Sequence, residues 1–159
     1  MPMSTEDLDL TELVGFIWLT TLEMAVEPAA DAPRAASEPV MEAQVHITGD
    51  WQGAVVLHAA PALVTKIAQR MFSLGDRTPS LDDMLDAFGE MANITGGNLK
   101  GLLSAGEAHL SLPAVVQGCD YQVSIPGSRQ VARKAFSCDG LPLVVTLLEP
   151  DRNRPRRDS

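Results

Sequence analysis

Apolar residues recur every three or four positions in three stretches of the chain, a spacing typical of helices with one buried face. The first stretch covers residues 6–26. The second begins at Pro61, which suits the first turn of a helix, and ends near Leu74, where Gly75 follows as a stop. The third and longest covers residues 80–104. The pattern therefore predicts three helices.

Between and after these helices, apolar residues alternate or run together over short stretches bounded by turn residues, which predicts strands. Gly49-Asp50 and Asp139-Gly140 lie between such stretches and predict hairpins. The predicted strands, in pairs, are residues 40–48 with 52–59, 109–117 with 121–125, and 130–138 with 141–149. The fold class that follows is α/β, with helices packed on a largely antiparallel sheet built from hairpins.

The predicted elements fit one domain over residues 1–149, since a chain of 159 residues can bury a single core. Residues 27–39 are rich in alanine and proline and predict an irregular linker. Residues 150–159 hold four arginines, two prolines and no apolar side chain, and predict a disordered tail.

The formal net charge is −9, which argues against binding to nucleic acid or to an anionic membrane surface. The acidic start of the chain lacks the basic segment of a secretory signal, so a cytoplasmic location is predicted. The two cysteines make no metal-site spacing, and no metal site is predicted.

The long helix divides into two faces at 100° per residue. One face is apolar and should contact the core; its members are Leu81, Met84, Phe88, Met91, Thr95, Leu99 and Leu102. The opposite face is polar or small and should meet solvent or a partner; its members are Asp86, Glu90, Asn93, Gly97, Lys100 and Ser104.

Three glycines lie on or beside this outer face: Gly96, Gly97 and Gly101. Each costs about 1 kcal/mol relative to alanine inside a helix, and solvation alone gives no reason for that cost. Close approach of another backbone or of a bulky side chain would give one. The alternative is that the helix breaks or kinks at these residues.

Glu90 and Asn93 are three residues apart, so their side chains stand side by side on the helix. Asparagine is no base at neutral pH, but its carboxamide can hydrogen-bond a water molecule and hold it in line for attack. Such positioning matters for phosphoryl transfer, and a neighbouring carboxylate can bind a lysine of the partner.

The sequence Asp86-x-x-x-Glu90-x-x-Asn93, followed by Ile94, Gly97-Asn98 and Leu112-Pro113, resembles the motif of the CheC/CheX/FliY family of chemotaxis phosphatases. No second Glu-x-x-Asn is present, since the first helix offers only Glu12-x-x-Gly15, and this makes CheX the closest branch. The gap between Asn93 and Pro113 is shorter than in the family, which suggests a shortened loop around Ala105-Gly106.

The resemblance implies a phosphatase that hydrolyses the phosphoaspartate of a CheY-like response-regulator receiver. Glu90 would contact the receiver's lysine and Asn93 would orient the attacking water. Asp86, Gly97 and Lys100 would border the interface, although Lys100 is alternatively a solvated charge. Mg²⁺ would belong to the receiver, with no cofactor on this chain. A homodimer through sheet edges is a further expectation. The alternative function is a non-catalytic module that binds a receiver or a signalling or flagellar assembly.

Overall fold

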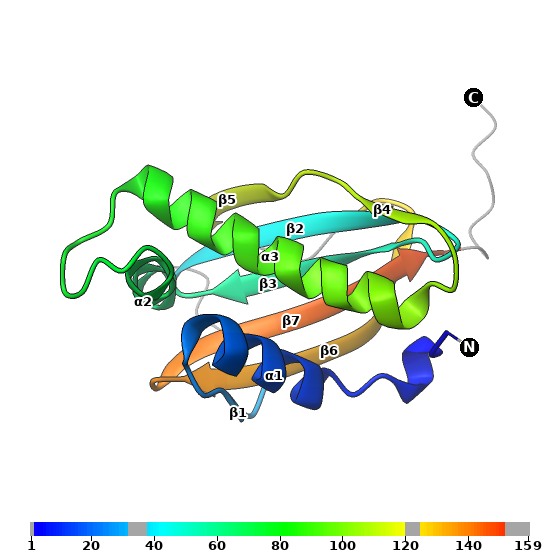
Figure 1. Ribbon diagram of the computed structural model, residues 1–159, viewed down its shortest axis with the longest axis horizontal. Helices are drawn as coiled ribbons and strands as arrows, with labels where there is room; N and C mark the ends of the chain where they lie inside the picture. The colour runs from blue at the N-terminus through cyan, green and yellow to red at the C-terminus, as the bar shows by residue number, and fades with distance from the viewer. Residues whose placement is uncertain (1, 32–37, 120–124, 152–159) are drawn as a thin grey trace.

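The computed structural model describes residues 2–31, 38–119 and 125–151. Along these residues one 3-10 turn and α1 come first, three strands follow, then α2 and α3, and the last four strands close the order (Figure 1). The helical elements are the turn Thr5–Asp7, α1 (Leu10–Leu22), α2 (Pro61–Met71) and α3 (Leu81–Leu103). The strands are β1 (Glu27–Pro28), β2 (Pro39–Gly49), β3 (Gly53–Ala59), β4 (Ala108–Leu110), β5 (Ala114–Cys119), β6 (Ser128–Cys138) and β7 (Leu141–Pro150).

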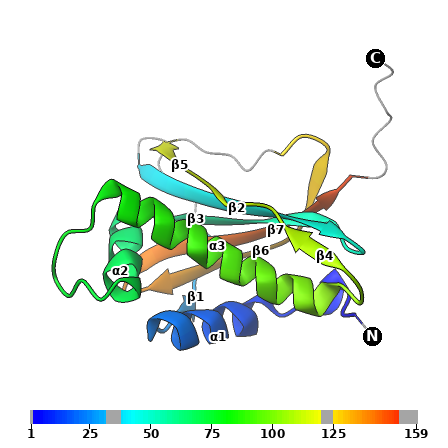
Figure 2. The ribbon, with the colours of Figure 1, turned by 45° about the horizontal axis from the view of Figure 1, so that its top comes forward.

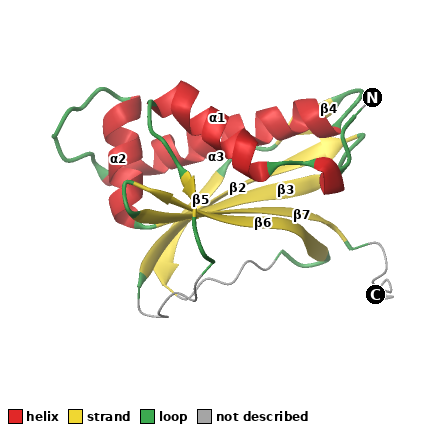
Figure 3. Ribbon diagram, turned by 90° about the horizontal axis from the view of Figure 1, so that it is seen from below, coloured by secondary structure: helices red, strands yellow, loops and turns green. Residues whose placement is uncertain are grey.

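The strands form one antiparallel sheet in the order β1-β6-β7-β3-β2-β4, with β5 also paired to β2. All three helices lie on one face of this sheet (Figure 3). Strand β2 shows how the sequence sets the two faces, because every second residue is buried under the helices: Met41, Ala43, Val45 and Ile47. The predicted fold class is confirmed.

The core lies between the helices and the sheet. Trp18 of α1, Phe88 of α3 and Phe136 of β6 are among its largest fully buried side chains. Most other core residues are leucine, valine, isoleucine, methionine or alanine. No helix in the described ranges has the length and apolar content needed to cross a membrane.

Both hairpins predicted from a Gly-Asp or Asp-Gly pair are present. Asp139 and Gly140 have φ values of 49° and 76°, and two successive positive values are what the tight turn between β6 and β7 requires. The turn between β2 and β3 is looser, because Ile47 pairs with Gly53.

The first two helices are shorter than predicted. Helix α1 ends at Leu22 because Glu23 takes a left-handed conformation, with φ of 55°. Helix α2 ends at Met71, and Ser73, with φ of 53°, already lies outside it. In both cases one residue in the left-handed conformation turns the chain out of the helix, although the apolar periodicity continues beyond that residue.

The segment predicted to be an irregular linker is partly a strand. Glu27 and Pro28 pair with the end of β6. Arg133 of β6 donates to both carboxylate oxygens of Asp31, at 2.6 and 3.1 Å, and holds the pKa of Asp31 below its usual value. These contacts hold residues 27–31 at the sheet edge, and residues 32–37 of the predicted linker lie outside the described residues. The predicted tail lies almost entirely outside the described residues.

Residues 109–117, predicted as one strand paired with residues 121–125, lie in two separate strands, β4 and β5. Both pair with β2, one after the other: Leu110 lies opposite Ile47, and Ala114 lies opposite Gln44. Residues 121–124 lie outside the described part of the chain. The apolar pattern predicted strand correctly at residues 109–110 and 114–117 and wrongly at 111–113, and it carries no information about which strand these residues pair with.

Candidate functional site

Helix α3 begins with a capping box. The Asp83 N–H donates to the Ser80 hydroxyl at 3.0 Å, and the Ser80 N–H donates to the Asp83 carboxylate at 3.2 Å. The helix then runs without interruption for 23 residues. The alternative in which the glycines break the helix is therefore wrong.

The buried face of α3 matches the predicted stripe at its centre. Phe88, Met91, Thr95 and Leu99 are fully buried. Leu81 is wrong as a core residue, since 49% of it is exposed. The reason is that the first turn of α3 extends beyond the ends of the neighbouring strands (Figure 1).

The outer face of α3 carries the predicted site residues. Asp86 and Glu90 are exposed, whereas Asn93, Gly97 and Lys100 are half-buried. Within the described ranges, no hydrogen bond or ion pair engages the side chains of Asp86, Glu90, Asn93 or Lys100. The face therefore presents a carboxylate and a carboxamide that the described fold does not use.

Asn98 provides a contrast on the same helix. Its side-chain N–H donates to the Ile94 carbonyl at 2.9 Å, one turn back. This amide is occupied by its own helix, whereas that of Asn93 is available. Of the two asparagines on α3, only Asn93 suits the handling of a water molecule.

The glycines of α3 have different surroundings. A Cβ at Gly96 would lie 2.6 Å from Val45 Cγ1 of β2, so this glycine lets the helix approach the sheet closely. A Cβ at Gly97 would meet only Leu110, at 3.9 Å, and one at Gly101 would meet nothing within 4 Å. The predicted close approach is confirmed at Gly96, but the neighbour is the protein's own sheet.

The connection between β4 and β5 runs along the flank of α3 (Figure 2). Pro113 Cγ lies 3.4 Å from the position of a Cβ at Gly89, and Leu110 lies near Gly97. Residues 89, 93 and 97 share one face of the helix, one turn apart. Asn93 therefore lies between these two contacts, on the flank of α3 that faces residues 110–113.

The loop predicted to be shortened joins α3 to β4 through residues 104–107. It packs against the turn between β2 and β3, where the Asp50 N–H donates to the Glu107 carbonyl at 3.3 Å. Gly106 sits so close to the Asp50 carboxylate that a Cβ would collide with it. The loop lies about three helical turns from Asn93.

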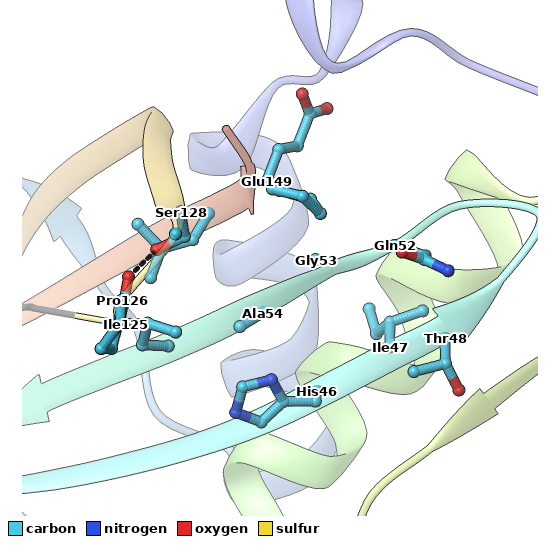
Figure 4. A pocket seen from close by; sticks show the side chains of 13 residues that line it. His46, Ile47, Thr48, Gln52, Gly53, Ala54, Ile125, Pro126, Ser128 and Glu149 are labelled. Atoms are coloured by element: carbon cyan, nitrogen blue, oxygen red, sulfur yellow. Dashed lines mark hydrogen bonds between the residues drawn. The ribbon is translucent and has the colours of Figure 1, made fainter. Parts of the chain in front are cut away.

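A pocket of about 210 Å³ lies on the opposite face of the sheet (Figure 4). His46, Gln52 and Glu149 contribute to its lining, and the Ser128 hydroxyl donates to the Ile125 carbonyl at its edge, at 2.5 Å. The sheet separates this pocket from Glu90 and Asn93. In the residues that the structure describes, no three metal-ligating side chains gather in one place.

Residues 41–137 match the family model described as "Chemotaxis phosphatase CheX". The fold is similar to that of CheX from Vibrio vulnificus, with 20% identity, a TM-score of 0.69, and coverage of 87% of this chain and 92% of that one. A chain of the CheX-CheY-BeF3-Mg complex from Borrelia burgdorferi has 16% identity, a TM-score of 0.68 and coverage of 87% and 94%. FliY from Thermotoga maritima has 17% identity, a TM-score of 0.53 and coverage of 94% and 92%. Comparison with curated protein sequences finds no match.

Proposed function

Because the chain belongs to the CheX family of chemotaxis phosphatases, we propose that it hydrolyses the phosphoaspartate of a CheY-like receiver domain. The observation that carries the proposal is the Asn93 carboxamide, half-buried on the flank of α3 and free of hydrogen bonds within the described residues. The similar Borrelia fold comes from a complex with CheY, which supports a receiver as the partner. The Mg²⁺ of the reaction would belong to the receiver.

In this mechanism Asn93 enters the receiver's active site and positions one water molecule. The side-chain oxygen accepts a hydrogen bond from the water, which places the water oxygen in line with the phosphorus. The new P–O bond forms as the bond to the aspartyl oxygen breaks, giving inorganic phosphate and a free carboxylate. The contribution of this chain is orientation, since it supplies neither nucleophile nor metal.

Glu90 would bind the lysine of the receiver and so fix the depth at which Asn93 enters. It stands one helical turn from Asn93 and is exposed, and Asp82 and Asp86 continue a row of carboxylates along the same helix. A row of negative charge favours approach of a cationic group on the partner.

Replacing Glu90 with glutamine should weaken receiver binding while leaving the reaction at saturation nearly unchanged. The change removes the charge and keeps the side-chain shape. A close interfacial ion pair supports a rise of about fivefold to tenfold in the half-saturating concentration. The measurement is decay of phosphorylated receiver over a concentration series of this protein.

Glu12→Gln is the matched control, because Glu12 is an exposed glutamate on α1, where no accompanying asparagine stands. It should behave as wild type. Equal effects of the two substitutions would show that Glu90 acts through the overall charge and not through a defined contact.

The remaining outer-face residues are proposed as the border of the interface. Asp86 lies one turn before Glu90, and Gly97 one turn after Asn93, where the lack of a side chain leaves room for the partner. Lys100 lies at the far end of this row. We place the protein in the cytoplasm, where receivers are phosphorylated.

We also propose that two copies associate through the outer edge of β6. Strand β1 pairs with β6 only at Phe136 and Ser137, and Ala29 and Asp31 bond to Ala135 and Arg133 beyond it. No described strand pairs with the first part of this edge. Light scattering should give about twice the mass of a 17.0 kDa chain at micromolar concentration. A mass of one chain throughout would contradict this proposal without affecting the phosphatase mechanism.

A further inference from the structure

Leu112 is the most exposed of the large hydrophobic residues that the structure describes, with 91% of its surface accessible. One exposed leucine is ordinary on a protein surface. The chain around Leu112, however, is held firmly in place, and it lies beside the site on α3.

The register of the sheet shows why Leu112 projects. Between the pairs Leu110–Ile47 and Ala114–Gln44, three residues stand opposite two residues of β2. One residue is surplus, so the backbone bulges, and a bulge redirects side chains. Leu112 is the central residue of this bulge.

Residues on both sides fix the bulge. The Ser111 N–H donates to the His46 carbonyl and the His46 N–H donates to the Ser111 hydroxyl, both at 2.9 Å. That hydroxyl in turn donates to the Leu112 carbonyl at 3.1 Å. On the other side Pro113 packs against α3 at Gly89. Leu112 is thus presented on an ordered segment, which reduces the entropy lost when it is bound.

The bulge adjoins the site directly. Its neighbours Leu110 and Pro113 contact α3 at Gly97 and Gly89, and Asn93 lies on the same helix face between these positions. A partner that takes Asn93 into its own active site must also cover the chain that flanks Asn93. Leu112 is the apolar residue it would meet there.

We propose that Leu112 is an apolar anchor for the receiver domain, bound by a nonpolar surface that borders the receiver's phosphorylation site. The inference rests on the proposed function and adds a contact beyond the helix. An apolar anchor beside polar contacts is a common arrangement in transient interfaces. Glu90 and Asn93 would supply polar contacts. Burial of Leu112 would favour receivers that have a matching nonpolar surface over those that lack one.

Leu112→Ala should raise the half-saturating concentration in the phosphate-decay assay about tenfold, with the rate at saturation unchanged. Leu112→Met should retain near wild-type affinity, because methionine keeps the apolar volume. Leu19→Ala on α1 is the matched control, since Leu19 is another exposed leucine, at 59%. It should leave both quantities unchanged.

Direct binding of each variant to a receiver carrying beryllofluoride separates this inference from the catalytic proposal. If wild type accelerates decay and Leu112→Ala binds the receiver with the same affinity, Leu112 is not an anchor, and the proposal of phosphatase activity is unaffected. If wild type binds without accelerating decay and Leu112→Ala binds about tenfold more weakly, Leu112 is an anchor, but the proposal of phosphatase activity is wrong. If wild type neither binds nor accelerates any receiver tested, both are wrong.

Discussion

Asn93→Ala should reduce the stimulated dephosphorylation of the receiver about a hundredfold, equivalent to ~2.7 kcal/mol of activation free energy. The substitution removes the carboxamide that orients water and leaves the helix intact, because alanine is the best helix former. Binding to a beryllofluoride-loaded receiver should survive, since Glu90 and the flanking residues remain. The measurements are single-turnover phosphate decay at saturating protein and a separate binding titration.

Asn98→Ala is the matched control for this experiment. It removes the same side chain from the same helix, but that side chain is bonded to the Ile94 carbonyl and faces away from the site. Its decay curve should coincide with that of wild type. If wild type and Asn93→Ala both bind the receiver and neither shortens the phosphate lifetime, the chain is instead a non-catalytic module that docks on receivers. If both shorten it equally, Asn93 does not orient the water.

Gly96→Ala should destabilise the fold by about 1–2 kcal/mol, after deducting the gain of ~1 kcal/mol from better helix propensity. The new methyl group would lie 2.6 Å from Val45 Cγ1, well inside van der Waals contact. Val45 is fully buried and β-branched, so it has little freedom to turn away. Helix and sheet must separate, and urea unfolding followed by circular dichroism measures the loss.

Gly101→Ala tests the same substitution on the same helix where space is open. A Cβ there meets nothing within 4 Å, so the variant should gain about 0.5 kcal/mol through reduced freedom of the unfolded chain. Loss of stability at Gly101 similar to that at Gly96 would mean that contact with Val45 is not the cause. A gain at both would show that the helix is free to shift on the sheet.

The placement of the candidate site residues on α3 was largely predictable, because a helix converts sequence spacing directly into position. The spacing of Asp86, Glu90 and Asn93 along the chain places them on one face of the helix. The exposure of Leu81 was not predictable, since it depends on how far the helix extends past the strands. The apolar periodicity of a helix describes that helix alone and gives no information about where the neighbouring strands end.

Pairing between distant strands needed the tertiary structure. The partner of both β4 and β5 is β2, some 65 residues earlier in the chain, which their own sequence does not indicate. The extra residue that exposes Leu112 is apparent only from the register of this pairing. The three glycines also look equivalent in sequence, whereas only Gly96 is pressed against the sheet.

The sequence by itself determined the helix, the hairpin at Asp139-Gly140, and the acid and amide that share one exposed face. These features depend on local geometry, which the chain carries with it. The tertiary structure decided that residues 110–113 flank Asn93 and that its amide has no described partner inside the fold. Those facts depend on which surfaces meet, and that is fixed only when the whole core packs.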